Sequence, residues 1–172
     1  MGTVEWLVLF GAACLIIGSF SYMKPTPKQK REAKIRMKAI HLGLRIKQLD
    51  MPDLSVTGRV NNTKAPLLFF QLQVPAKVGA EKRIELENRW IIQRTTGESG
   101  IYLQEGWAWN LRSTEKTVIE FLEEFLKTQN EHIQAIEVNK YYVAISWDER
   151  PNDEYTDTLM QDLKVLMQFS IK

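Results

Sequence analysis

Few side chains in this 172-residue chain have the types and spacing that catalysis or metal binding requires. His41 and His132 are the two histidines and Cys14 is the single cysteine, so a histidine dyad, a thiolate metal site and a disulfide framework all lack material. The glycine-containing segment 97–100 lacks the lysine of a phosphate-binding loop. We therefore expect a protein that is not an enzyme, with no metal site and no cofactor.

Carboxylates are the remaining candidates for chemistry. Glu120, Glu123 and Glu124 fall on the polar side of a predicted helix, where a solvated face explains them. A second acidic group surrounds a predicted strand-to-helix junction: Asp148, Glu149, Asp153, Glu154 and Asp157. It lacks the spacing of a calcium loop, and acids near a helix N-terminus favour the helix dipole. An enzyme that uses carboxylates alone remains an alternative.

The N-terminal segment predicts a transmembrane anchor over residues 1–23. Residues 6–23 contain no charge, and at 1.5 Å per residue they extend about 27 Å, close to the thickness of a hydrocarbon core. Trp6 and Tyr22 stand near the two ends, where headgroup-level aromatics are favoured. A cleaved signal peptide is the alternative, but no Lys or Arg precedes the apolar run.

The charge distribution predicts the orientation of this anchor. Nine basic residues and one acid lie between Lys24 and Leu49, whereas no basic residue precedes the span. The positive-inside rule then places the N-terminus in the periplasm and the C-terminal domain in the cytoplasm of a bacterial inner-membrane protein. From Asp50 to Lys172 the chain has 14 basic and 19 acidic residues, so the body is mildly acidic.

Small residues in the span follow a 3-4-3 spacing, which places them along one stripe of a helix: Gly11, Cys14, Gly18 and Ser21. Such a stripe lets a second membrane helix approach closely, which predicts a helix-docking face and a membrane-protein partner. The alternative is that small residues are common in membrane spans and have no partner here.

Residues 24–43 read as a basic juxtamembrane helix. Thr26 and Gln29 have the spacing of a capping box, and Gly43 is placed to end the helix. The expected apolar face consists of Ala33, Met37, Ile40 and Leu44, with Ile35 and Leu42 outside it.

Three interpretations of this basic neck compete. It is a topology determinant, or a contact for anionic lipid headgroups through Lys28, Lys30, Arg31, Lys34 and Lys38, or a nucleic-acid site. Without interleaved aromatic residues, and next to a bilayer, the neck is not expected to bind nucleic acid.

Residues 44–172 predict an α+β domain, an antiparallel sheet with two helices packed on one face. Strands are expected at 44–49, 54–60, 67–74, 89–94 and from Trp107, followed by a hairpin that turns at Asn139-Lys140. A helix capped by Ser113 or Thr114 runs to Lys127, and a last helix capped by Asn152 or Asp153 buries Tyr155, Leu159, Leu163, Leu166 and Met167. Trp90, Trp107, Trp109 and Trp147 fall in the strands, where core packing is favoured over an exposed partner site.

The anchor, followed by the neck sequence KPTPKQKREAKIRMKAIHLGLRI, loosely resembles the YajC family of small bacterial inner-membrane proteins, and more closely resembles a group of uncharacterised gammaproteobacterial single-pass inner-membrane proteins. The resemblance covers about the first 45 residues and rests on topology and basic composition. It implies an accessory role at the Sec translocon and transfers no functional residue. The body departs from the family, because it is much larger, adds two helices and lacks the family's short glycine-containing strand segment after the neck.

Together these patterns predict a non-enzymatic accessory or scaffold subunit of a bacterial inner-membrane complex, which docks through its membrane helix and its cytoplasmic domain. A peripheral regulator whose neck binds anionic lipid is the first alternative, and a Sec accessory protein is the second.

Overall fold

The computed structural model describes residues 2–22, 24–52, 64–75, 89–95, 101–149 and 155–171. The chain consists of two compact units, Met1–Lys34 and Ile35–Lys172. The elements in chain order are α1 (Thr3–Tyr22), α2 (Pro27–His41), β1 (Arg45–Pro52), β2 (Lys64–Gln73), β3 (Trp90–Arg94), β4 (Ile101–Gln104), β5 (Trp107–Leu111), α4 (Lys116–Phe125), the 3-10 turn η1 (Leu126–Thr128), β6 (Ile133–Val138), β7 (Tyr142–Trp147) and α5 (Tyr155–Ile171).

The first unit contains α1 and the start of α2. The predicted capping box is confirmed, because the Thr26 amide donates to Gln29 Oε1 at 2.8 Å and the Gln29 amide donates to Thr26 Oγ1 at 3.2 Å. A search of the described residues finds no helix with the length and hydropathy needed to cross a membrane.

The helix α2 ends at His41, two residues before the glycine that the sequence indicated. Gly43 has a φ of 85°, a left-handed conformation that costs a glycine little. The amide of Gly43 donates to the Ile40 carbonyl at 2.9 Å, and the amide of Leu44 donates to the Ala39 carbonyl at 3.0 Å. These bonds satisfy carbonyls of the last turn and redirect the chain into β1.

The predicted apolar face of the neck is wrong for three of its four members: Ala33, Met37 and Ile40 are exposed, and Leu44 alone is buried. Ile35 and Ala39 are the fully buried residues of α2, whereas Met37 and Ile40 are more than half exposed. Ile35 and Ala39 join the same core cluster as the sheet and α5. The C-terminal half of α2 is therefore part of the body, and its packing partners rather than its own best stripe decide which side is buried.

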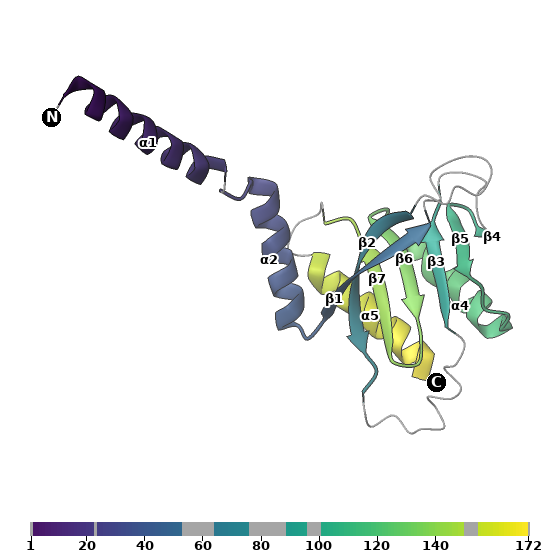
Figure 1. The fold of residues 1–172 in the computed structure, drawn as a ribbon. Coiled ribbons are helices and arrows are strands. Elements are labelled where there is room, and N and C mark those ends of the chain that lie inside the picture. Colours follow the sequence, from purple (N-terminus) through teal and green to yellow (C-terminus); the bar gives the residue numbers. More distant parts are fainter. Residues whose placement is uncertain are drawn as a thin grey trace. The chain divides into compact units, whose positions relative to one another are not determined.

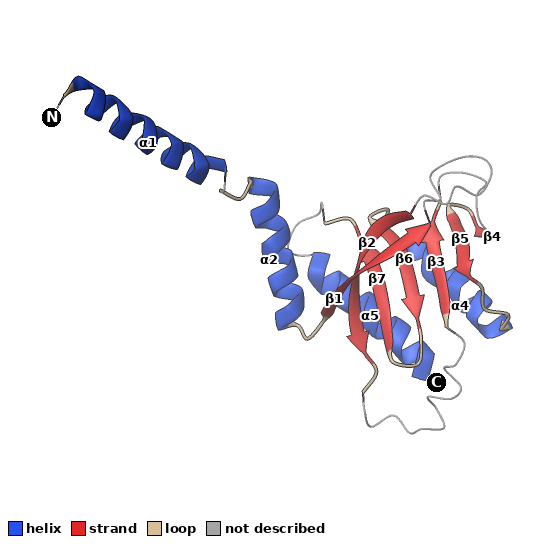
Figure 2. Ribbon diagram, viewed as in Figure 1, coloured by secondary structure: helices blue, strands red, loops and turns tan. Residues whose placement is uncertain are grey.

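The second unit is built on an antiparallel sheet, as the sequence predicted. The described strands form a seven-stranded sheet in the order β1-β2-β7-β6-β3-β5-β4, and every neighbouring pair is antiparallel. The helices α4 and α5 lie on one face of it (Figure 2). Val118, Leu122 and Phe125 of α4 and Leu159 and Leu163 of α5 are buried there.

Other predicted elements differ in detail. The segment 54–60 lies outside the described residues, and β4 was not predicted. Glu115 is the N-cap residue of α4 and makes no side-chain cap bond, so the predicted cap at Ser113 or Thr114 is wrong. Ser113 Oγ instead accepts the Glu115 amide at 3.3 Å.

The tryptophan prediction is confirmed. Trp90, Trp107, Trp109 and Trp147 are each 2–3% exposed and all belong to the core beneath the helices. Trp90 and Trp109 meet edge to face, with ring centroids 6.4 Å apart. Trp147 stacks on Tyr155 of α5 at 4.9 Å, which joins the last helix to the centre of the sheet.

The opposite, helix-free face is covered by β1, because the sheet curls. Although β1 is an edge strand, Gln93 Nε2 of β3 donates to the Pro52 carbonyl at 2.9 Å, and Asn110 Nδ2 of β5 lies 3.9 Å from Met51 Sδ. Figure 1 shows β1 crossing over the neighbouring strands toward β3. Small side chains below it, Ala135 and Ala144, let the strand approach and close a second, smaller core.

Candidate functional site

A groove of about 390 Å³ opens on the helix-free face, at the end of the sheet where β6 turns into β7. Lys47 and Leu49 of β1 form one side, and Arg89 lies immediately before β3. The remaining lining residues come from the β6–β7 connection and the start of β7: Asn139, Lys140, Tyr141 and Tyr142. The curl of the sheet creates this groove, since it brings β1 opposite strands that are not its neighbours.

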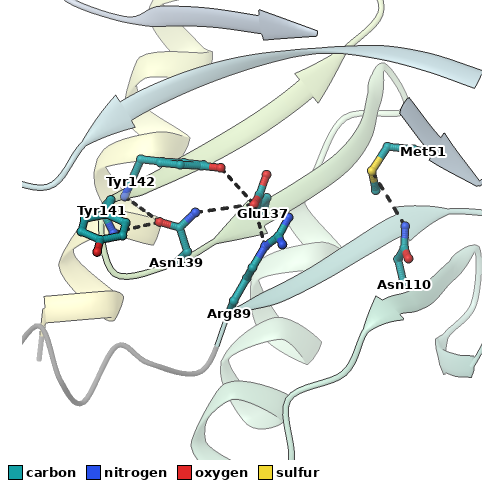
Figure 3. Close-up of polar contacts among 7 residues, drawn as sticks. All are labelled: Met51, Arg89, Asn110, Glu137, Asn139, Tyr141 and Tyr142. Carbon is teal, nitrogen blue, oxygen red and sulfur yellow. Dashed lines mark hydrogen bonds and ion pairs between the residues drawn. The ribbon is translucent and has the colours of Figure 1, made fainter. Parts of the chain in front are cut away.

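Beside the groove lies the carboxylate of Glu137, which is 0% exposed. Its Oε1 accepts from Arg89 Nε at 3.0 Å, from the Tyr142 hydroxyl at 3.1 Å and from Asn139 Nδ2 at 3.5 Å. Figure 3 shows these three side chains directed at the carboxylate from the β6–β7 turn and from the start of β3. A buried charge needs such partners, because transfer out of water is costly without them.

Local turn chemistry holds Asn139 in place. Its side-chain Oδ1 accepts hydrogen bonds from the backbone amides of Tyr141 and Tyr142 at 2.8 and 3.1 Å. Its backbone amide donates to the Tyr142 carbonyl at 3.0 Å. An asparagine that bonds to the backbone two residues later is typical of a tight turn. The connection has three residues, Asn139 to Tyr141, one more than the predicted Asn139-Lys140 turn.

The same hydrogen bonding perturbs Tyr142. Burial, then the charge of Glu137 and the bond to it, raise the pKa of the Tyr142 hydroxyl, although Asn139 and Arg89 act in the opposite sense. Tyr142 therefore keeps its proton at neutral pH and acts as a donor to Glu137.

Within the described part of the chain, four buried polar atoms on this face have no hydrogen-bond partner: Glu137 Oε2, Gln71 Nε2, Gln93 Oε1 and Ser146 Oγ. The strand register places them in two adjacent rows. Gln71 and Glu137 flank Ala144 in one row, and Ser146 and Gln93 flank Ala135 in the next. Directly opposed residues share a face, so these polar groups lie close together beneath β1. A cluster of buried polar groups of this kind is suited to binding ordered water.

The groove itself carries positive charge. Among the described residues that line or adjoin the groove, Lys47, Arg89 and Lys140 contribute three cations and Glu137 one anion, which gives +2. Among the described residues, neither lysine has an acidic partner. Lys140 Nζ lies 5.2 Å from the centre of the Tyr141 ring, a cation–π contact that leaves the ammonium at the groove. The arrangement is suited to binding an anion.

The predicted helix-docking residues all fall on α1. A Cβ added at Gly11 would meet no atom within 4 Å, and Cys14 is exposed. Gly18 and Ser21 lie within the same helix. No contact among the described residues tests whether this stripe has a partner, and it stays a prediction.

The predicted lipid-binding residues differ from one another. Lys28, Lys30, Arg31 and Lys34 are exposed on α2, whereas Lys38 Nζ lies 2.8 Å from Asp157 Oδ2. Lys28 also lies 3.7 Å from Glu32, an exposed pair at helical spacing that contributes little. Lys38 therefore joins α2 to α5. Lys28, Lys30, Arg31 and Lys34 remain the candidates for binding lipid.

The acidic group at the strand-to-helix junction is largely paired with basic residues. Arg36 Nε donates to Glu149 Oε1 at 2.8 Å, with a second bond between the same groups, and His132 Nδ1 lies 3.4 Å from Asp148. Asp153 and Glu154 lie outside the described residues. Within the described ranges, no group of three metal-binding side chains gathers.

Sequence reasoning did not find Glu137 or Arg89. Glu137 alternates with Ile136 and Val138, which is also the pattern of a strand with one solvated face. The available signal was weak: the pairing partner of Glu137 in the predicted hairpin is Ala144, a small residue in an apolar strand.

Comparison of this chain with protein-family models, with curated proteins and with solved structures found no match.

Proposed function

We propose that this chain is a non-enzymatic accessory protein, anchored by α1 in a bacterial inner membrane with its C-terminal body in the cytoplasm. The observation that carries the proposal is the exposure of the apolar side chains on α1. Val4, Trp6, Leu7, Val8, Phe10 and Leu15 are each between 65% and 75% exposed. Moving apolar surface out of water is favourable by about 25 cal/mol per Å², and lipid is one environment that excludes water from such a surface.

The charge-free run of the sequence and the basic residues after it support a bilayer as that environment. Residues 6–23 contain no charge and would extend about 27 Å as a helix, at 1.5 Å per residue. The exposed basic residues of α2 come after α1 in the chain, and they favour retention of the C-terminal end of α1 on the cytoplasmic side.

Cysteine labelling tests both the anchor and its orientation, since Cys14 is the single cysteine. In a Cys14→Ala background, Gly2→Cys places one thiol before α1 and Lys127→Cys places one thiol in the body, in η1. We expect the protein to stay with membranes after alkaline carbonate extraction. A membrane-impermeant maleimide should label position 2 in intact spheroplasts and position 127 only after lysis. Extraction by carbonate contradicts the anchor, and labelling of position 127 in intact spheroplasts contradicts the orientation.

The accessory role requires a partner in the membrane. Gly11, Cys14, Gly18 and Ser21 support docking within the bilayer, because their spacing aligns them along one side of α1. The test is purification of the full chain from membranes beside a version with a polyleucine span. Loss of a stoichiometric partner supports docking through these residues, and its retention assigns docking to the body. A Sec-translocon subunit is the partner that the resemblance to YajC implies.

A regulator that reads anionic lipid is the second candidate, favoured by the exposure of Lys28, Lys30, Arg31 and Lys34. Each basic residue near an anionic surface contributes about 1 kcal/mol. Replacing these four residues with glutamine should weaken association of α2 with vesicles containing phosphatidylglycerol, measured by amide exchange. Glutamine at Lys116, Lys127 and Lys164, which are exposed elsewhere on the body, is the control. If the amides of α2 are equally protected from exchange in the unchanged protein, the four-residue variant and the control, the lipid hypothesis is contradicted.

A further inference from the structure

The groove beside Glu137 presents a guanidinium held in one orientation. Arg89 uses Nε to bond the buried carboxylate, at 3.0 Å, while its side chain is 52% exposed. Among the described residues, Arg89 makes its hydrogen bond through Nε and none through its two terminal nitrogens. A guanidinium anchored through one nitrogen retains the planar pair of donors that binds a carboxylate or phosphate through two oxygens.

Two further cations and two apolar side chains line the groove beside Arg89. Lys47 reaches it from β1 and Lys140 from the β6–β7 turn, and Leu49 and the 58% exposed Tyr141 add apolar area. The net charge of +2 matches a phosphate monoester, whose second pKa is about 6 and which is close to a dianion at neutral pH. The volume of about 390 Å³ accommodates a small organic molecule.

We propose that this groove binds a phosphate monoester, with Arg89, Lys47 and Lys140 holding the phosphate group and Tyr141 and Leu49 contacting the organic part. Glu137 is a positioning residue: it touches no ligand atom and fixes the direction of the Arg89 guanidinium. The source of the phosphate is a soluble metabolite or a lipid headgroup with a terminal phosphate. The inference concerns the body alone and does not rest on the membrane anchor.

The primary test is calorimetric titration of the full chain, in nanodiscs of neutral phosphatidylcholine, with phenyl phosphate as the probe. Benzenesulfonate is the matched control ligand, because it has a similar ring and one negative charge. We expect phenyl phosphate to bind at least about tenfold more tightly than benzenesulfonate, and its affinity to rise between pH 5 and pH 7 as the phosphate loses its second proton. Equal affinity for the two probes, or no binding at millimolar phenyl phosphate, overturns the proposal.

Variants locate the site. Lys47→Gln and Lys140→Gln leave the Glu137 network intact, and each should weaken phenyl phosphate binding about threefold to tenfold. Arg89→Gln should weaken it by about tenfold or more. Arg45→Gln, an exposed arginine of β1 that does not line the groove, is the matched control and should change affinity less than twofold. Equal losses in Arg45→Gln and in the groove variants would show a diffuse cationic surface and contradict a built site. Near-UV circular dichroism checks that each variant is folded, and the two lysine variants decide the question if Arg89→Gln is not.

A second nanodisc composition identifies the source of the phosphate. Phosphatidic acid carries a terminal phosphate, whereas phosphatidylglycerol is anionic without one. If the headgroup occupies the groove, phosphatidic acid should reduce the apparent affinity for phenyl phosphate and phosphatidylglycerol should not. If neither lipid competes, the ligand is soluble, and the phosphatidylcholine measurement stands as the evidence for the site.

Discussion

Glu137 and Arg89 form an ion pair in which the carboxylate is fully buried and the guanidinium is half exposed, with 3.0 Å between Arg89 Nε and Glu137 Oε1. This asymmetry places a negative charge inside the sheet and its neutralising cation at the wall of a groove. The two residues are 48 positions apart in the chain, and the antiparallel pairing of β3 with β6 brings them together.

Removing the cation should expose the cost of the buried charge. We expect Arg89→Ala to destabilise the fold by about 2–3 kcal/mol, below the usual range for a buried pair because Arg89 is half exposed and two neutral donors remain. The double variant Arg89→Ala with Glu137→Gln should recover part of that loss, since an amide needs no cation. Chemical unfolding followed by tryptophan fluorescence measures both. The single variant Glu137→Gln completes the cycle. If the double variant loses as much unfolding free energy as Arg89→Ala and Glu137→Gln lose together, the pair is not coupled.

Acid should stabilise the body through Asp162 on α5. Burial raises the pKa of this carboxyl from 3.8 to about 6, and a bond to Gln129 partly opposes the shift. The folded state therefore keeps a proton that the unfolded state loses between about pH 4 and pH 6, so this contribution is present below pH 4 and is lost as pH rises through 6. Asp162→Asn should flatten this slope and raise the melting temperature at pH 7.5 more than at pH 4.5. An unchanged slope in the variant would assign the pH dependence to other groups.

The packing of α2 on the body is tested by two neighbouring side chains. Ile35 is fully buried and Met37 is 55% exposed. Ile35→Ala should cost about 2–5 kcal/mol through lost contacts and a cavity, whereas Met37→Ala should change stability by less than about 0.5 kcal/mol. Thermal unfolding of the full chain measures both. If the two variants have equal effects, the C-terminal half of α2 does not pack on the body.

The crossing of β1 over the sheet depends on small side chains below it. Ala144 is fully buried between Gln71 and Glu137 in the strand register. Ala144→Leu should destabilise the body by about 1–3 kcal/mol, because the added atoms would crowd β1 and the buried polar groups of Gln71 and Glu137. Ala33→Leu on the exposed side of α2 is the control and should be nearly neutral. Chemical unfolding of both variants is the measurement, and a stable Ala144→Leu protein would mean that β1 lies farther from the sheet than described.

The sequence by itself determined the features that depend on neighbours along the chain. The capping box of Thr26 and Gln29, the glycine that ends α2, the β6–β7 hairpin and the buried stripe of Leu159, Leu163 and Leu166 were all predicted, because each depends on residues a few positions apart. The burial of the strand tryptophans was favoured for a similar reason, since such large rings rarely remain in water.

Only the tertiary structure decided which strands pair across long distances and which faces are covered. The sheet order places β7 between β2 and β6, and its curl brings Pro52 and Met51 to β3 and β5. That curl buries Glu137, although the local pattern around it is equally compatible with a solvated face, and docking of α2 buries Ile35 instead of Met37. Periodicity specifies that a strand or helix has an apolar side; whether its other side meets water or a second layer depends on contacts that no local pattern contains.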